Sequence, residues 1–348
     1  MSHELHGRVL VTGGAGFIGS ALVWELNRRG MEDVVVADVL DRTEKWKNLA
    51  PLRILDYVEA ADLLAAVERN PSCLGDYATI LHLGACSSTT ETDSAYLMRN
   101  NYGFTKTLAE AAIGRGVRFV YASSAATYGA LENDLSESRP LESLRPLNMY
   151  AYSKHLFDLY AQRTGMLDRI TGLKYFNVYG PNEWHKGDMR SVVAKSYDQI
   201  RAGGGVSLFR SYRPDFADGK QRRDFIYVKD AVKMTLALAA NPAATGIFNL
   251  GSGESRTWLD LATAVFAALG RPPQIAFVDM PDTLRPKYQY LTEARIDRLR
   301  DAGFADSLTS LEDGVADYVQ RYLVDERHLD PAVPEPSGAG SPAAARER

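Results

Sequence analysis

The strongest constraint on the fold of this chain is a glycine-rich segment near its N-terminus, residues 12–19, which reads TGGAGFIG. It follows an apolar run at residues 8–12 and precedes residues 17–29, whose apolar side chains recur at helical spacing. This order predicts a strand, a tight turn and a helix. Glycines 13, 16 and 19 lack Cβ atoms, so the backbone can approach a pyrophosphate and place its charge at the helix N-terminus. The segment therefore predicts a dinucleotide-binding site.

The rest of the chain alternates between apolar runs and helical segments. Continuous apolar runs are typical of parallel strands that are covered on both faces. They occur at residues 34–38, 79–83, 119–122, 172–176 and 247–250. Helical periodicity lies between them, as at residues 102–115 and 152–164. The alternation predicts the α/β fold class, with a Rossmann-like, doubly wound parallel sheet.

A second, smaller unit is predicted to be discontinuous along the chain. The regular pattern breaks down after residue 178 and returns near residues 224–250, where residues 226–228 are strand-like. We expect residues 1–178 and the returning segment to form the dinucleotide-binding domain. Residues 179–223 and 251–325 are then expected to form a C-terminal substrate-binding lobe.

Composition narrows the classes of function. The net charge is -4 and the pI about 5.9, so no basic field exists that would hold nucleic acid or an anionic membrane. Cys73 and Cys86 are too few for a disulfide framework and lack metal-ligand spacing, which indicates a reducing compartment and no metal site. The N-terminus does not resemble a signal peptide, and no apolar run approaches the ~20 residues that span a bilayer. We therefore expect a cytoplasmic protein.

Residues 330–348 are rich in Pro, Ala, Gly and Ser and are expected to be a disordered tail.

The end of the second predicted strand bears on the choice of cofactor. Asp38 can accept hydrogen bonds from the adenosine ribose hydroxyls, which favours NAD. Lys45 and Lys47 follow closely, and a cation there can pair with the 2′-phosphate of NADP instead. The residues themselves leave NAD and NADP open.

Three further side chains form a candidate proton-transfer site. Tyr150 and Lys154 lie four residues apart at the start of a predicted helix, which places them on one face. A nearby ammonium group and a nicotinamide cation favour the phenolate, which can then act as a base, and Lys154 can also hold the nicotinamide ribose. Ser124 lies in YASSAATYG, where a strand runs into hydroxyl residues, and is the candidate partner of the reacting oxygen, with Ser123 and Thr127 as alternatives.

The glycine-rich turn, the serine strand end and the Y-x-x-x-K pair, in this order over residues 8–325, resemble the extended short-chain dehydrogenases. Further blocks resemble the ADP-heptose 6-epimerase family within that class. They are LHLGACSSTTETD at 81–93, NNY at 100–102, PLNMYAYSKHLFD at 146–158, KYFNVYGPNEWHKG at 174–187 and PDTLRPKYQ at 281–289. The resemblance implies inversion at C6 of ADP-heptose through a transient 6-keto sugar and a tightly bound nicotinamide cofactor, in the supply of heptose for the lipopolysaccharide core.

The resemblance also implies individual site residues. The sugar oxygen changes its position during inversion, so the reaction needs an acid/base on each face, and Lys186 matches the family's second one. Implied cofactor contacts are Phe17, Ile18, Leu83, Gly84, Ala85, Ser87, Asn100 and Val178. Implied substrate contacts are Ser87, Ser124, Asn177, Lys186, Asp188, Lys195, Phe209, Ser211, Arg223 and Tyr288. Arg223 suits the substrate diphosphate because a guanidinium group can pair with it through two hydrogen bonds.

The family resemblance implies one NADP per subunit and a homo-oligomer, with a pentamer as one arrangement. Asp188 and Lys195 depart from the serine and histidine of other members. One rival is an enzyme for another nucleotide sugar, such as a UDP-hexose 4-epimerase or a 4,6-dehydratase; Ala125 and Ala126 stand where a dehydratase would carry acidic residues. The other rival is a nonenzymatic dinucleotide sensor, which would not need two proton-transfer groups.

Overall fold

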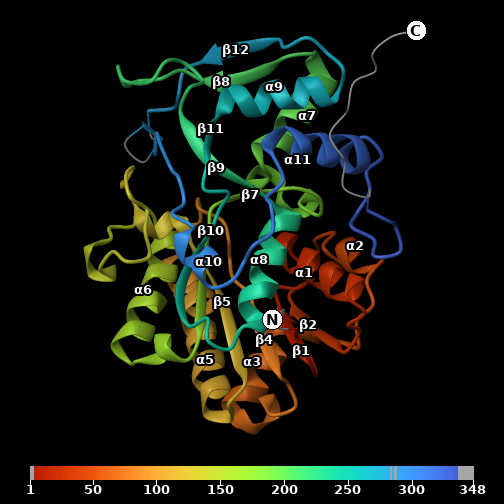
Figure 1. Cartoon of the computed structure of the whole chain (residues 1–348), viewed down its shortest axis with the longest axis vertical. Coiled ribbons are helices and arrows are strands. Elements are labelled where there is room, and N and C mark those ends of the chain that lie inside the picture. Colours follow the sequence, from red (N-terminus) through yellow and green to blue (C-terminus); the bar gives the residue numbers. More distant parts are fainter. Residues whose placement is uncertain (1–3, 283, 286–287, 336–348) are drawn as a thin grey trace.

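A seven-stranded parallel sheet forms the centre of the protein. The structure is a computed structural model, and it describes residues 4–282, 284–285 and 288–335. The strand order is β10-β6-β5-β4-β1-β2-β3 (Figure 1). The strands are β1 (Val9–Thr12), β2 (Val34–Asp38), β3 (Asp56–Glu59), β4 (Thr79–His82), β5 (Arg118–Ser124), β6 (Thr171–Tyr175) and β10 (Gly246–Leu250). The predicted fold class is confirmed.

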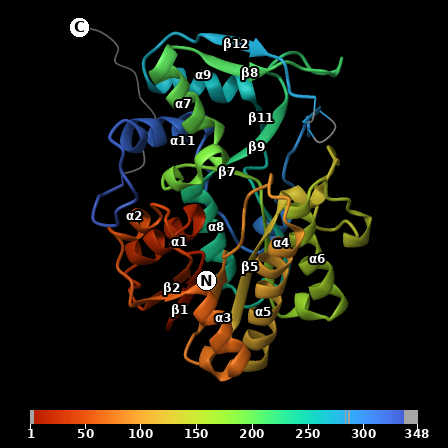
Figure 2. The ribbon, with the colours of Figure 1, turned by 180° about the vertical axis from the view of Figure 1, so that it is seen from behind.

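Helices cover both faces of this sheet (Figures 1 and 2). Successive strand residues point to opposite faces, so Val9 and Val11 pack with α1 and α8, whereas Leu10 packs with α3, α5 and α6. These helices are α1 (Phe17–Arg28), α3 (Ala60–Arg69), α5 (Phe104–Arg115), α6 (Met149–Arg163) and α8 (Val228–Ala240). Burial on both faces explains why the inner strands are continuous apolar runs.

Two local elements differ from the pattern in the sequence. Strand β3 lies at the edge of the sheet and its side chains are half-buried or exposed, so it has no apolar run that would reveal it. The helix predicted at residues 102–115 begins as α4 (Ser94–Leu97), widens into the π-helical turn η2 (Met98–Gly103) and continues as α5. A π turn adds a residue to the turn and therefore changes which side chains face inward.

Two small sheets lie at one end of the central sheet (Figure 1). The first has the order β11-β9-β7, with β7 (Asn177–Tyr179), β9 (Arg222–Tyr227) and β11 (Ser255–Thr257), and the second pairs β8 (Val206–Phe209) with β12 (Ile275–Val278). The sequence analysis expected residues 226–228 to return to the central sheet. This expectation is wrong for residues 226–227, because they belong to β9, which pairs with β7 and β11. The chain returns through α8 and β10 instead. The domain boundaries stay predictions.

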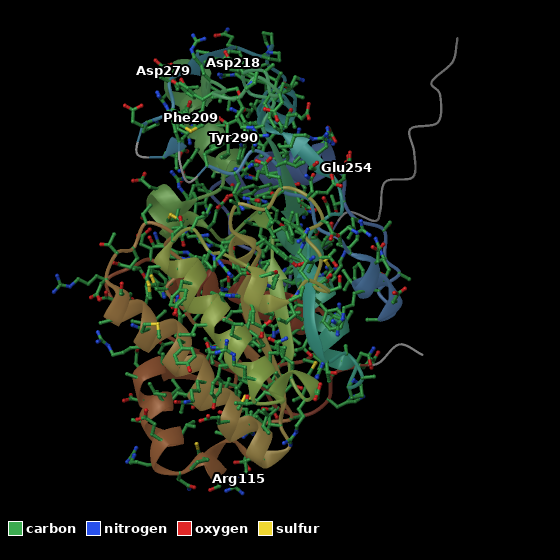
Figure 3. The ribbon with its side chains drawn as sticks, turned by 90° about the vertical axis from the view of Figure 1, so that its left-hand side faces the viewer. Arg115, Phe209, Asp218, Glu254, Asp279 and Tyr290 are labelled. Atoms are coloured by element: carbon green, nitrogen blue, oxygen red, sulfur yellow. The ribbon has the colours of Figure 1, made fainter. Side chains whose placement is uncertain are left out.

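The remaining helices pack mainly around these small sheets. In Figure 3, Phe209, Asp218, Asp279 and Tyr290 mark this end of the molecule, opposite Arg115. The remaining helices are α2 (Trp46–Leu49), α7 (Val192–Gly203), α9 (Trp258–Ala268), α10 (Asp297–Asp301), α11 (Leu311–Tyr318) and the π-helical turn η8 (Val319–Leu323). Short 3₁₀ turns are η1 (Pro71–Leu74), η3 (Ala125–Tyr128), η4 (Leu141–Ser143), η5 (Met166–Asp168) and η6 (Trp184–Met189). Within the described ranges no helix is both long and apolar enough to cross a membrane.

The C-terminal segment is ordered further than the sequence predicts. Leu329 is fully buried, and the Glu335 carboxylate lies 2.6 Å from Lys229 Nζ. The predicted disordered tail is therefore wrong for residues 330–335, because a buried leucine and an ion pair fix this part of the chain. Residues 336–348 lie outside the described residues, as do Thr283, Pro286 and Lys287 of the PDTLRPKYQ block.

Candidate active site

The glycine-rich turn is packed so closely that only glycine fits. Gly13 has φ +68, in the left-handed region that favours glycine. A Cβ atom there would collide with the backbone of Gly84, and one on Gly19 would collide with the carbonyl oxygen of Gly13. Gly16 precedes α1 and has no side chain to cap the helix, so the first-turn amides remain available to an anion. The turn fits the pyrophosphate of a dinucleotide.

Asp38 ends β2 beside this turn and already has three hydrogen-bond partners. Its carboxylate accepts from Ala15 N at 2.8 Å, from Val39 N at 2.7 Å and from Lys45 Nζ at 2.6 Å. The ion pair with Lys45 is mostly buried, with side-chain exposures of 7% for Asp38 and 17% for Lys45. An acceptor for ribose hydroxyls and a cation for a phosphate therefore lie side by side.

A cavity of about 1420 Å³ extends from the glycine-rich turn across the ends of the strands. Its position at the carboxyl ends of parallel strands is the usual ligand site in this architecture. Of the residues predicted for the site, the lining includes Gly13, Gly16, Phe17, Ile18, Gly19, Asp38, Lys45, Leu83, Gly84, Ala85, Ser87, Ser124, Tyr150, Lys154, Asn177, Val178 and Lys186. The structure thus brings segments that are far apart in the sequence to one cavity.

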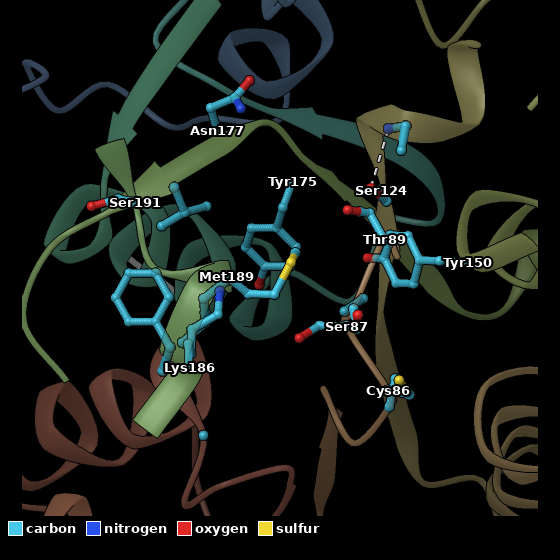
Figure 4. Close-up of a pocket in the computed structure, with 18 of the residues that line it drawn as sticks. Cys86, Ser87, Thr89, Ser124, Tyr150, Tyr175, Asn177, Lys186, Met189 and Ser191 are labelled. Carbon is cyan, nitrogen blue, oxygen red and sulfur yellow. Dashed lines mark hydrogen bonds between the residues drawn. The ribbon is translucent and has the colours of Figure 1, made fainter. Parts of the chain in front are cut away.

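Ser124, Tyr150 and Lys154 meet where β5 ends. Ser124 is the last residue of the strand, and its hydroxyl accepts from Ala126 N at 3.1 Å (Figure 4). Tyr150 and Lys154 lie in the first turns of α6, which begins after Asn148, whose side chain accepts from Ala151 N. Lys154 Nζ donates to the carbonyl oxygen of Ala122 at 2.9 Å. This bond fixes the ammonium group at the part of the cavity that Ser124 and Tyr150 also line.

Burial shifts both titratable groups of this cluster toward neutrality. It raises the pKa of the Tyr150 phenol, and the neighbouring Ser124 hydroxyl opposes that shift. It lowers the pKa of Lys154 to about 8, against the opposing charge of Asp158. A lysine that titrates near neutrality can exchange protons as well as supply charge.

Lys186 reaches the cavity from the other side, on the turn η6. Its Nζ lies 5.2 Å from the centroid of the Phe17 ring. Burial lowers the pKa of Lys186, and the charge of Glu183 opposes this shift. Glu183 is held by hydrogen bonds from the backbone and hydroxyl of Ser191 and from Tyr318. The fixed carboxylate of Glu183 therefore keeps the pKa of Lys186 from falling as far as burial alone would lower it.

The arrangement offers a proton-transfer group at each of two positions. Figure 4 shows Ser124 and Tyr150 on one side of the cavity, and Lys186 on the other, with Tyr175 and Met189 between them. A substrate oxygen could therefore be deprotonated on one side and protonated on the other. Among the described residues no cluster of three or more His, Cys, Asp and Glu side chains could hold a metal ion.

A buried polar network that the sequence analysis missed supports β5. Asp158, on the turn of α6 after Lys154, accepts from Tyr121 at 2.9 Å and from Ser123 at 2.7 Å. Lys174 Nζ lies 3.4 Å from the same carboxylate, and both side chains are at most 1% exposed. The four-residue spacing from Lys154 was the available signal, because it places Asp158 on the same helical face.

The predicted contact Asn100 does not line the cavity. Its amide donates to Tyr96 O at 2.8 Å, within its own helical turn. The next residue, Asn101, is buried and bonds both the amide and the carbonyl of Cys86, a cavity residue. The π-helical turn η2 turns Asn101 inward at this point, so it is Asn101 that holds the cavity wall.

Arg223 and Tyr288 lie behind the main cavity. The Arg223 guanidinium is buried, 5.1 Å from the Tyr288 ring centroid and 5.6 Å from that of Trp258, and among the described residues no carboxylate forms an ion pair with it. Trp258 lines the main cavity, whereas Tyr288 lines a second hollow of about 610 Å³. Gln289 lines both. Arg223 is thus a buried cation at their junction.

Four other predicted substrate residues do not line the main cavity. Asp188 is exposed in the same turn as Lys186, and Lys195 is half-buried on α7. Phe209 ends β8, and Ser211 follows it, with its amide bonded to Asp218 at 2.8 Å. Cavity residues that the sequence analysis missed include Thr43, His185, Met189, Arg190, Ser191, Trp258, Leu261 and Thr292. Most of them lie in irregular segments, where no periodicity indicates which side chains face inward.

Comparison with known proteins agrees with this geometry. The profile of the NAD dependent epimerase/dehydratase family matches residues 9–251. An ADP-L-glycero-D-manno-heptose-6-epimerase of Nitratidesulfovibrio vulgaris (strain DP4) is 54% identical over 315 residues, which cover 90% of this chain and 97% of the relative.

Two crystal structures have the same fold. The ADP-L-glycero-D-manno-heptose-6-epimerase of Helicobacter pylori superposes with a TM-score of 0.76 at 27% identity, over 91% of this chain and 96% of that one. The UDP-glucose 4-epimerase of Thermus thermophilus, in complex with NAD, gives a TM-score of 0.71 at 30% identity, over 90% and 97% of the two chains. With a matching sequence profile, a relative of more than half identical residues and a shared fold, this chain belongs to the NAD dependent epimerase/dehydratase family and, within it, to the ADP-L-glycero-D-manno-heptose-6-epimerases.

Proposed function

We propose that this protein is an isomerase that interconverts ADP-D-glycero-D-manno-heptose and ADP-L-glycero-D-manno-heptose at C6, through a transient 6-keto sugar. Its product would supply heptose for the lipopolysaccharide core. The observation that carries the proposal is the placement of Tyr150 and Lys186 on opposite sides of one cavity in a chain 54% identical to such an epimerase. A binding module would have no need of two such groups.

The chain's own residues handle the proton. When bound, a nicotinamide cofactor would accept a hydride from C6 of the sugar and return the same hydride to C6. Tyr150 exchanges a proton with the C6 oxygen on the β5 side of the cavity, where Ser124 donates a hydrogen bond to that oxygen. After rotation about the exocyclic bond the oxygen faces Lys186, which exchanges a proton with it on the other side of the cavity. Lys154, held on Ala122 O, would bind the nicotinamide ribose and keep positive charge near Tyr150.

The substrate would extend from this point toward the small sheets. Ser87 and Asn177 line the same cavity as the two proton-transfer groups and would contact the sugar. Arg223 would bind the diphosphate, because a buried guanidinium without a carboxylate partner among the described residues favours an anion. Tyr288, Phe209 and Ser211 would then lie on the nucleoside side.

We propose NADP as the cofactor, one per subunit, with NAD as the alternative that Asp38 keeps open. Lys45→Ala should raise the Kd for NADP by about tenfold to a hundredfold, because a hydrogen bond to a charged group contributes about 1.5–3 kcal/mol. The Kd for NAD should change little. Calorimetric titration of the cofactor-free protein measures both, with Lys47→Ala as the neighbouring control, and equal losses for NAD and NADP would contradict the assignment.

The position of Lys154 predicts a pH dependence. Its pKa is lowered by burial to about 8, so its ammonium form is present below that pH and is lost as the pH rises through it. We expect kcat/KM to fall severalfold between about pH 7.5 and 9.5. Lys154→Arg should be slower at every pH but should lack this falling limb, since a guanidinium group stays charged. A falling limb that persists in Lys154→Arg would assign it to another group.

The direct test is to incubate the purified protein with ADP-D-glycero-β-D-manno-heptose and follow the C6 proton by NMR. Conversion without stoichiometric consumption of NAD(P) is expected, because the cycle has no net redox change. Conversion of UDP-glucose to UDP-galactose in place of ADP-heptose would move the function to the other nucleotide sugars. The homo-oligomer and the cytoplasmic location stay predictions from the sequence.

A further inference from the structure

Asn48 is a buried side chain that joins four segments of the chain. It lies on the short helix α2 and is 1% exposed. Its Nδ2 donates to the carbonyl oxygens of Ala15 at 2.9 Å and Asn182 at 3.1 Å, and lies 3.3 Å from Nδ1 of His185. Its Oδ1 lies 2.8 Å from Nδ1 of His328. The glycine-rich turn, the segments around Asn182 and His185, and the C-terminal segment thus meet at one amide.

The chemistry of these contacts fixes the protons. Carbonyl oxygens only accept, so the atom of Asn48 that faces Ala15 and Asn182 must be the amide nitrogen. The remaining oxygen of Asn48 can only accept, so His328 must carry a proton on Nδ1. His185 faces the same nitrogen with its Nδ1, at 3.3 Å. The two hydrogens of this nitrogen are directed at the two carbonyl oxygens, and one of them can be shared with Nδ1 only if Nδ1 is unprotonated. A proton on Nδ1 would face an amide nitrogen, which cannot accept it, so neutral His185 carries its single proton on Nε2.

His185 lies at the cavity that also contains the glycine-rich turn. It lines the main cavity, directly before Lys186 in the chain. Burial and the charges of Lys45 and Lys186 lower the pKa of His185 to about 4, so the ring is neutral near pH 7. Among the described residues its Nε2 has no hydrogen-bond partner. The charges of Asp38 and Lys45 both act on the pKa of His185, so this donor lies in the same part of the cavity as that ion pair.

His328 belongs to a segment that is docked independently at two other points. Leu329 is fully buried, and its amide donates to Asn182 Oδ1 at 2.9 Å. Further along, Glu335 pairs with Lys229 at 2.6 Å. The position of His328 is therefore set by its own segment and not by Asn48 alone.

We propose that Asn48, oriented by His328, is a positioning residue that presents the Nε2–H of His185 to an oxygen of the bound dinucleotide, a ribose hydroxyl or a 2′-phosphate oxygen. The same amide ties the loop that carries Lys186 to the glycine-rich turn. Through His328 and Asn48, the C-terminal segment thereby contributes indirectly to the binding of the cofactor. This inference rests on the cofactor assignment of the proposed function.

The test combines a spectroscopic and a binding measurement on the full chain. In histidine-labelled protein, nitrogen NMR should show the His185 Nδ1 unprotonated and its Nε2 protonated. His328→Leu should raise the Kd for NADP by about tenfold, the value of one hydrogen bond. His328→Asn keeps a donor at the Nδ1 position and should stay within about twofold of wild type. Glu335→Gln, in the same segment but away from Asn48, is the matched control and should also stay within about twofold.

A second variant keeps the test valid if His328→Leu disturbs the fold. His185→Leu leaves Asn48 and its bonds to the carbonyl oxygens of Ala15 and Asn182 in place and removes the proposed donor, so it should raise the Kd for NADP by about tenfold. A protonated His185 Nδ1 in the wild type, or wild-type NADP affinity in a folded His328→Leu, would overturn the proposal. Neither readout needs turnover, so failure here is distinguishable from failure of the epimerase assignment.

Discussion

Replacing Tyr150 by phenylalanine should lower kcat for C6 epimerisation by about a thousandfold, within the range of about 10²–10⁴ that a positioned acid/base contributes. The variant keeps the aromatic ring and loses only the hydroxyl. On the β5 side of the cavity the neighbouring Ser124 cannot take over, because an aliphatic hydroxyl is a far weaker acid than a phenol. The KM for ADP-heptose should change little, since the lost interaction acts mainly in the transition state.

The matched control for this variant lies two residues further along the same helix. Tyr152 is 45% exposed and does not line the cavity, so Tyr152→Phe should keep wild-type kcat. Both variants are assayed by NMR after the bound cofactor has been quantified, because an empty protein would also be inactive. A Tyr150→Phe enzyme that is cofactor-loaded and keeps more than about a tenth of wild-type kcat would remove Tyr150 from the proposed role.

Replacing Lys186 by methionine should cause a loss of similar size, about a hundredfold or more. Methionine has similar length and apolar character, so it can keep the packing against the Phe17 ring while the amine is lost. Lys233→Met removes a lysine on α8 whose side chain is 38% exposed and should be neutral. Wild-type kcat in Lys186→Met would mean that a single group serves both faces of the sugar.

The two variants also distinguish the two faces. Each keeps one proton-transfer group, so each should still oxidise the epimer whose C6 hydroxyl faces that group. The resulting keto sugar exchanges its oxygen with water through its hydrate, and mass spectrometry in heavy-oxygen water would detect the label. Tyr150→Phe and Lys186→Met are expected to label opposite epimers, which would assign each residue its direction. Labelling of the same epimer by both would contradict an acid/base on each face.

The sequence predicted best those features that local geometry determines. Gly13 and Gly19 were identifiable because the turn excludes a Cβ atom, and the inner strands because burial on both faces makes them continuously apolar. Strand β3 escaped notice because it lies at the exposed edge. Residues 226–227 were correctly predicted as strand, whereas Val228 begins α8, and an apolar run carries no information on which sheet it joins.

The site was predictable where a motif fixes spacing and unpredictable where tertiary contacts decide. Tyr150 and Lys154 are four residues apart on one helix, so their proximity follows from the sequence. Asn100 and Asn101 are neighbours, and only the π-helical turn decides which one faces inward. Asn48 carries no motif, since its partners come from segments up to 280 residues away.

The route of the chain between its sheets limits how the protein can be divided. The chain leaves the central sheet after β6 for β7, β8 and β9, returns through α8 to β10, and leaves again for β11 and β12. No single cut can therefore remove the small sheets and leave the central sheet whole. A chimera that exchanges the small sheets with those of a relative must transplant at least two segments together, with three junctions matched at once. Unfolding should likewise be one cooperative transition, because neither part holds all its own connections.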